Sequence, residues 1–118
     1  MKKKKVGTKL GSEKAQRKAL LTSLTRELFV REKIKTTEGK AKEALPIVEN
    51  IITKAKKGDL HSRRILLESF DKKVVKKIIE DVAPRYKEKS GGYARVIKLG
   101  QRKSDGAKMA NLELIKNK

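Results

Sequence analysis

Positive charge is concentrated at the two ends of this 118-residue chain, and this limits which segments can form a packed core. Residues 1–40 carry a net charge of +9 and residues 83–118 a net charge of +7, whereas residues 41–82 carry only +3. Like charges repel one another in a compact state, so we expect the nearly neutral middle to form the scaffold. The basic ends are then available to bind a polyanion that neutralises the total of +19.

The aliphatic content is sufficient for one small core. Leu, Ile, Val and Phe together make up about a quarter of the chain, which is above the level typical of wholly disordered, highly charged sequences. Only four aromatic residues are present, so aliphatic side chains must build most of the core. The length fits a single domain.

Several classes of protein are excluded by what the sequence lacks. Without cysteine it has no disulfide framework, thiol nucleophile or cysteine-ligated metal, which suits a reducing cytoplasm. No apolar run exceeds three residues, so we expect no membrane span. The basic start is not followed by an apolar segment like that of a secretion signal, and we expect the protein to stay in the compartment where it is made.

The first forty residues predict an arm, a helix and a strand. Residues 1–11 hold five lysines, two glycines and little to bury, and we expect an extended basic arm that is disordered when free. A helix is predicted over residues 12–31, with Ser12 as N-cap and an apolar stripe. That stripe consists of Ala15, Ala19, Leu20, Leu24 and Leu28. The β-branched run Lys33–Thr37 then predicts a strand.

The nearly neutral middle predicts three further helices. The second helix should run from a cap at Thr37 to about Lys57, with Gly58 as its stop and a kink near Pro46. Its stripe is the most regular in the chain: Ala41, Ala44, Leu45, Val48, Ile51, Ile52 and Ala55. A third helix should follow Asp59 and bury Leu60, Ile65, Leu66 or Leu67, and Phe70. A fourth should follow Asp71, bury Val74, Val75, Ile78, Ile79 and Val82, and end at Pro84.

The C-terminal third predicts two paired strands. Residues 87–92 read as a loop, residues 93–99 as a strand, and residues 109–115 as its partner across a turn that contains Asp105-Gly106. The predicted fold is therefore a two-layer α+β domain over residues 12–118, in the order helix, strand, three helices, two strands. Helices should cover one face of a small mixed sheet.

No enzyme signature is present. His61 is the only histidine, and it has neither cysteines nor a carboxylate cluster with which to form a metal site. No catalytic triad order, nucleotide-binding loop or dinucleotide motif occurs, and Ser90-Gly91-Gly92 is too short to cradle a nucleotide. We therefore expect no catalysis, no metal, no cofactor and no small-molecule substrate.

The basic residues instead predict a phosphate-binding surface. Most are lysines, which bind phosphate as point charges, and the scarcity of aromatics argues against base stacking on an exposed platform. A structured nucleic-acid backbone fits this pattern. A membrane surface fits less well, because the apolar stripes contain no Trp and are needed for the core.

Fragments spread along the whole chain resemble one family. In order they are Lys9-Leu10-Gly11, Arg17-Lys18-Ala19-Leu20, Ile34-Lys35-Thr36-Thr37, Lys40-Ala41-Lys42-Glu43, Arg63-Arg64, Pro84-Arg85-Tyr86, Gly91-Gly92-Tyr93-Ala94-Arg95-Val96, Arg102-Lys103 with Asp105, and Met109-Ala110-Asn111-Leu112-Glu113-Leu114. Together they are similar to the family of bacterial-type large-subunit ribosomal protein seventeen. The sequence departs from the usual family pattern at Lys2, Lys3, Lys4, Lys5, Gln16, Thr22, Ser23 and Ala94.

The resemblance implies a structural protein of the large ribosomal subunit in the cytoplasm. It further implies binding to the large-subunit (23S-type) ribosomal RNA, beside neighbouring subunit proteins near the base of the exit tunnel. We expect no membrane contact and no homo-oligomer. An architectural, nucleoid-type nucleic-acid-binding protein is the alternative, because it would need the same charge.

The candidate RNA-binding residues fall into three groups. Those expected to act by charge are Lys2, Lys3, Lys4, Lys5, Lys9, Lys14, Arg17 and Lys18. Those expected to clamp the RNA backbone from the scaffold are Arg63, Arg64, Arg85, Arg95, Arg102 and Lys103. The last loop adds Lys89, Gly91, Gly92 and Tyr93, where the glycines either allow close approach to RNA or simply make a tight turn.

Overall fold

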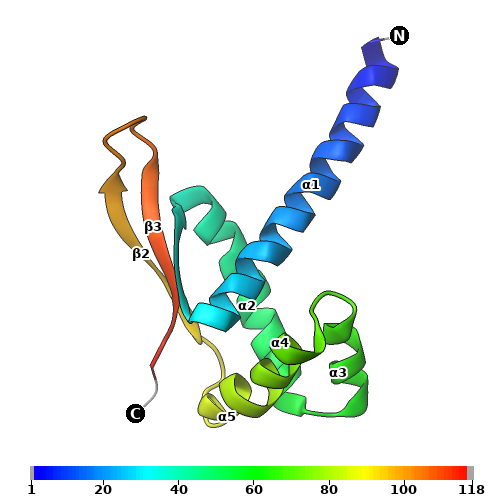
Figure 1. Cartoon of the computed structure of the whole chain (residues 1–118), viewed down its shortest axis with the longest axis vertical. Coiled ribbons are helices and arrows are strands. Elements are labelled where there is room, and N and C mark those ends of the chain that lie inside the picture. Colours follow the sequence, from blue (N-terminus) through cyan, green and yellow to red (C-terminus); the bar gives the residue numbers. More distant parts are fainter. Residues whose placement is uncertain (1, 117–118) are drawn as a thin grey trace.

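The computed structural model describes the backbone of residues 2–116 and the side chains of residues 13–116. The fold is α+β, and the predicted order of helix, strand, helices and two strands is confirmed (Figure 1). The elements are α1 (Lys2–Arg31), β1 (Lys33–Thr37), α2 (Glu38–Lys57), α3 (Leu60–Leu67), α4 (Lys72–Lys77), a π-helical segment η1 (Ile78–Val82), α5 (Ala83–Arg85), β2 (Ala94–Gln101) and β3 (Lys108–Leu114).

The sheet has three strands in the order β1-β3-β2, and both pairings are antiparallel. The expectation of a mixed sheet was therefore wrong. The hairpin makes β3 antiparallel to β2, and β1 pairs with the other edge of β3, where Lys33 lies opposite Glu113. Helix α2 covers one face of the sheet through Ala41, Ala44, Val48 and Ile52, each fully buried (Figure 1).

Helix α1 begins at Lys2, and this corrects the expectation of an extended arm over residues 1–11. Adding a residue to an existing helix forms a hydrogen bond without the cost of nucleation, and lysine is a good helix former. The helix predicted from residue 12 therefore extends backwards through the lysine run. The separation of residues 1–11 from a domain over residues 12–118 stays a prediction.

The first part of α1 projects from the body of the protein, as Figure 1 shows. Every described residue from 13 to 20 is exposed, so the predicted burial of Ala15, Ala19 and Leu20 was wrong. The buried face of α1 begins a turn later with Thr25, Leu28 and Phe29. The radius of gyration is 16.3 Å, compared with about 13.5 Å for a compact chain of this length.

The C-terminal end of α2 and the start of α3 follow the sequence signals, whereas Thr37 lies at the N-cap of α2 without a side-chain capping hydrogen bond. Gly58 ends α2 in the left-handed conformation (φ 62°), and its N–H donates to the carbonyl of Ala55. The side chain of Asp59 then accepts a 2.8 Å hydrogen bond from the backbone N–H of Ser62 and caps α3. Helix α2 continues through Pro46.

The predicted fourth helix is one continuous helical path formed by α4, the π-helical segment η1 and α5. It starts after Asp71 as expected but continues past Pro84 to Arg85. Within it, the N–H of Ala83 bonds to the carbonyl of Ile78, five residues earlier. Proline has no N–H and its ring crowds the carbonyl four residues back, so a π-helical segment just before Pro84 lets the path continue.

Glu32 joins several elements where the chain turns from α1 into β1. It is the one non-glycine residue with a positive φ (69°) in the described part of the chain. Its carboxylate accepts hydrogen bonds from Arg85, one of them 2.9 Å long, and lies 3.4 Å from Nζ of Lys77. Its carbonyl accepts from the N–H of Leu114 at the end of β3. These bonds compensate for a strained backbone.

A glycine within α2 and the glycine that ends it offer a matched pair of alanine substitutions. Gly58→Ala should lower the free energy of unfolding by about 1 kcal/mol, because a Cβ is unfavourable at positive φ. Gly39 lies within the helix, and a Cβ added there meets open space. Gly39→Ala should therefore raise the free energy of unfolding by about 0.5–1 kcal/mol. Urea unfolding of both variants measures the difference, and equal effects would contradict the assigned helix end.

The Glu32 junction predicts a specific loss of stability in acid. Hydrogen bonds from Arg85 lower the pKa of Glu32 from its ordinary value of 4.5 to about 2. A depressed carboxyl pKa stabilises the fold above about pH 4.5, and this contribution disappears as the pH falls toward 2. Glu32→Gln should cost about 1–2 kcal/mol at neutral pH. It should also flatten the fall in stability over that acid range.

Unfolding followed from pH 7 to pH 2 tests this prediction. Glu68→Gln is the control, because Glu68 is exposed just after α3 and should leave the acid profile unchanged. A profile of Glu32→Gln that parallels the wild type would contradict the role of this junction.

Candidate nucleic-acid interface

Four of the six arginines predicted to bind RNA are paired with carboxylates. Arg17 on α1 forms a two-pronged ion pair with Glu43 on α2, and one of its contacts, from Nε, is 3.1 Å long. Nε of Arg95 lies 2.7 Å from Glu113 on the neighbouring strand, and Nε of Arg102 lies 2.9 Å from Asp105 across the hairpin turn. Each pair holds its guanidinium in a defined position at the surface.

Two of these arginines, Arg102 and Arg17, lower the pKa of the carboxylates that they bind. The side-chain hydrogen bond from Arg102, helped by the N–H of Ala107, lowers the pKa of Asp105 to about 2. The hydrogen bond from Arg17 likewise lowers the pKa of Glu43. A phosphate that binds either arginine must therefore share it with, or displace, a charged competitor.

The fourth arginine, Arg85, is engaged inside the scaffold. It bonds to Glu32 and also to Asp81, four residues earlier, and its side chain is 29% exposed. Tyr93 is more deeply buried, because it is only 1% exposed and the centroid of its ring lies 5.3 Å from that of Tyr86. The side chain of Tyr93 is thus a core element, and the predicted contact of Tyr93 with RNA stays a prediction.

The last loop is fixed to α2 by two side chains. The Glu49 carboxylate accepts hydrogen bonds from the backbone N–H of Tyr93 (3.0 Å) and of Ala94 (3.3 Å). Lys56 donates to the carbonyl of Lys89 and, over 3.0 Å, to the hydroxyl of Tyr93. Gly92 has φ 66°, so the turn itself requires glycine there. Lys89 and the two glycines therefore occupy a defined surface loop.

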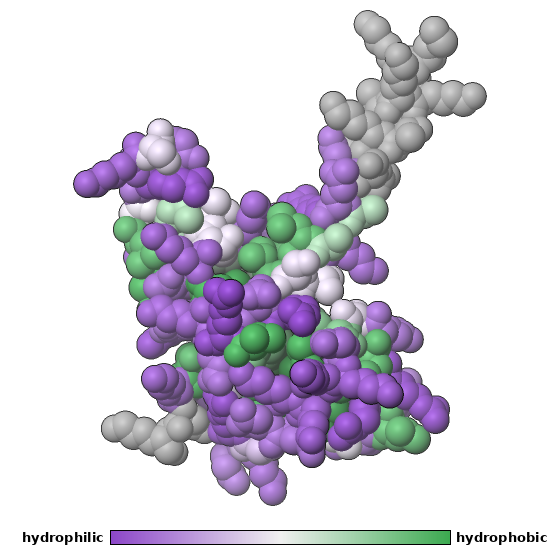
Figure 2. All heavy atoms as spheres, viewed as in Figure 1, coloured by the Kyte–Doolittle hydropathy of each residue, from purple (hydrophilic) through white to green (hydrophobic). Residues whose placement is uncertain are grey.

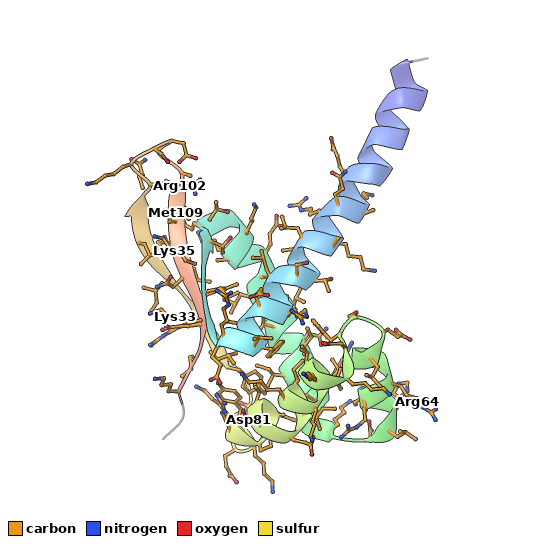
Figure 3. All side chains as sticks on the ribbon, in the orientation of Figure 1. Lys33, Lys35, Arg64, Asp81, Arg102 and Met109 are labelled. Atoms are coloured by element: carbon orange, nitrogen blue, oxygen red, sulfur yellow. The ribbon has the colours of Figure 1, made fainter. Side chains whose placement is uncertain are left out.

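The open face of the sheet carries two lysines that the sequence prediction missed. Lys33 and Lys35 are exposed on β1, while Ile34 between them packs against the core (Figure 3). Side chains alternate along a strand, so the two lysines share one face with Arg95. The alternation of Lys33, Ile34 and Lys35 in the sequence is the signal that could have located these two lysines.

The remaining candidate residues lie on separate parts of the molecule. Lys14 and Lys18 are exposed on the projecting part of α1, and Lys103 is exposed at the hairpin turn. Arg64 lies on α3, on the opposite side of the molecule from Lys33 and Lys35 (Figure 3). Arg63 is next to it and half-buried. The side chains of Lys2, Lys3, Lys4, Lys5 and Lys9 lie outside the described residues.

Hydrophilic side chains dominate the face of the molecule that is seen in Figure 2. Among residues 13–116, no three His, Asp or Glu side chains are grouped so that they could hold a metal ion. No described helix is long and apolar enough to cross a bilayer. The aromatic residues Phe29, Phe70, Tyr86 and Tyr93 are each at most 6% exposed. The fold and its surface therefore define a basic scaffold protein whose surface suits contact with a polyanion.

Comparison with known proteins identifies the family. The model of the family described as Ribosomal protein L17 matches residues 20–115. A relative from an Exiguobacterium species, named large ribosomal subunit protein bL17, is 49% identical over 115 residues, which covers 92% of this chain and 97% of the relative. Proteins of the same name from Caldanaerobacter subterraneus subsp. tengcongensis and Symbiobacterium thermophilum are each 50% identical over 108 residues, which covers 91% of this chain and 96% of each relative.

The chain belongs to the ribosomal protein L17 family. It is therefore a ribosomal protein with a structural role in translation, works in the cytoplasmic ribosome, and is not an enzyme. The resemblance found in the sequence and the predicted absence of catalysis are both confirmed.

The hydrogen bonds from the last loop to Glu49, here called the clamp, predict that the loop loses order when Glu49 is replaced. Glu49→Ala leaves the N–H groups of Tyr93 and Ala94 without their carboxylate acceptor, which should cost about 1–3 kcal/mol. Hydrogen exchange at these two amides should accelerate. Glu43→Ala on the same helix is the matched control, because Glu43 bonds to Arg17 and not to the loop. Equal exchange in both variants would contradict the clamp.

Proposed function

We propose that this protein binds the large-subunit ribosomal RNA through its phosphate backbone and helps to hold RNA segments together. The observation that carries the proposal is the distribution of basic side chains over three separate surfaces of one rigid scaffold. These surfaces are the projecting part of α1, the open sheet face with its hairpin, and α3. Cations on different sides of one body can lower the repulsion between RNA segments that approach it from different directions.

Backbone contact is favoured over base stacking on aromatic rings. All four aromatic side chains are buried, so the described surface offers no aromatic platform for bases. Lysines supply most of the exposed charge and bind phosphate without reading sequence. The shape of the RNA, presented to fixed cations, is then what the protein recognises.

The residues proposed for RNA contact follow from their placement. On α1 they are Lys14, Arg17 and Lys18, and we include Lys2, Lys3, Lys4, Lys5 and Lys9 of the same helix. Elsewhere they are Lys33, Lys35, Lys89, Gly91, Gly92, Arg95, Arg102, Lys103, Arg63 and Arg64. Arg85 acts by holding the scaffold. The expected neighbours are other large-subunit proteins near the base of the exit tunnel. Each large subunit is expected to hold one copy of this chain.

The affinity for a structured fragment of large-subunit RNA should depend steeply on salt. About six to ten neutralised phosphates would lose roughly three to five decades of affinity between 50 and 200 mM salt. Replacing Lys33 and Lys35 together by Gln should reduce the slope of log affinity against log salt by about 1.5–2. Filter binding at several salt concentrations measures this slope.

The control replaces the same two lysines by Arg, which keeps the charge and should keep the slope. An unchanged slope in the Gln variant would remove the open sheet face from the interface. Duplex DNA that competes as well as the RNA fragment at fixed salt would favour an architectural DNA-binding role. Co-sedimentation of the tagged protein with large subunits in a lysate tests its assignment to that subunit.

A further inference from the structure

A groove between α1, α2 and α3 has an apolar floor in an otherwise highly charged surface. Its volume is about 430 Å³, and the floor is formed by Leu21, Ile47, Ile51, Ile65, Leu66 and Phe70. In Figure 2 apolar surface is visible where α1 meets the body, among hydrophilic side chains. Apolar surface offers water no hydrogen-bond partners, so a groove of this kind favours an apolar occupant.

The rim of the groove is cationic on both sides. Lys14, Arg17 and Lys18 approach from α1, and Lys54 approaches from α2. None of the lining residues is acidic, and the nearby carboxylate of Glu43 is already bonded to Arg17. The occupant should therefore combine an apolar body with negative charge on both sides of that body.

An unpaired nucleotide has this combination, because a flat base sits between two phosphates along the chain. The rim residues of α1 are also part of the proposed RNA-binding surface, so RNA bound there would pass directly over the groove. Asn50, which lines the groove and is exposed, offers both a donor and an acceptor to a base edge. The aliphatic side chains that line the groove offer apolar contact to the base faces.

We propose that this groove takes a single base extruded from the ribosomal RNA, with the flanking phosphates on Lys14, Lys18 and Lys54. The inference rests on the proposed RNA-binding function and adds a base-binding site to it. An acidic amphipathic segment of another protein would meet the same charges. It is less well supported, because the α1 side of the rim already belongs to the RNA-binding surface.

The test uses three RNA duplexes that differ at one position. The first carries a single bulged 2-aminopurine, the second carries an abasic residue at the bulge, and the third is fully paired. Fluorescence anisotropy should show about tenfold tighter binding of the bulged duplex than of the other two. The emission of the 2-aminopurine should rise as the base leaves the stack. Equal affinity for all three duplexes would overturn the proposal.

Two variants of similar surface exposure separate the groove from the general interface. Ile47→Ser changes a floor residue that is 36% exposed, and Leu67→Ser changes an α3 residue that is 40% exposed and lies outside the groove. Ile47→Ser should abolish the preference for the bulge while binding of the paired duplex stays the same. Leu67→Ser should keep the preference. The opposite pattern, or no difference, would overturn the proposal.

The outcomes distinguish this inference from the function on which it rests. Steeply salt-dependent binding of all duplexes without a preference for the bulge would overturn the groove alone. Weak, salt-insensitive binding of every duplex would overturn the RNA-binding function as well. A Glu- and Leu-rich amphipathic peptide that displaces the 2-aminopurine duplex from the wild-type protein at much lower concentration than unlabelled bulged RNA does would overturn the proposal and assign the groove to a protein partner.

Discussion

The junction at Glu32 holds the architecture together. One carboxylate accepts hydrogen bonds from Arg85 while the same residue's carbonyl accepts from Leu114, so the end of α1, the last turn of the helical path and the end of β3 meet at one point. Lys77 adds a further tie by donating to the carbonyl of Val30, over 2.9 Å. The strained backbone of Glu32 lets α1 turn directly into β1. The direction in which α1 projects is therefore set by this turn.

Helix α2 connects the core of the fold to the basic surface residues. Its apolar stripe supports the sheet, while Glu49 and Lys56 hold the last loop and Glu43 holds Arg17 of α1. The same helix forms one side of the apolar groove. A single nearly neutral element thus fixes the relative positions of basic residues from both ends of the chain, as the proposed binding of separate RNA segments requires.

The local rules of helix and strand formation predicted most of the fold. Gly58 and Asp59 mark helix ends through their own backbone and side-chain preferences, so they could be read without the structure. Which part of α1 is buried could not be predicted in this way. An apolar stripe of Ala15, Ala19 and Leu20 does not show whether another element packs against it. The antiparallel direction of β1 depended equally on long-range packing. The burial of Tyr93 was equally hidden, because the sequence does not show that its ring packs against Tyr86.

The paired arginines have a consequence for selectivity. Arg17, Arg95 and Arg102 each start from an ionic bond to a carboxylate, so a phosphate that takes over a guanidinium performs an exchange instead of a simple addition. A loosely held or flexible polyanion gains little from such an exchange. A rigid RNA surface that offers oxygens to several of these arginines together gains more. In the proposed function, the carboxylates paired with these arginines would thus act as a threshold that favours folded RNA over other anions.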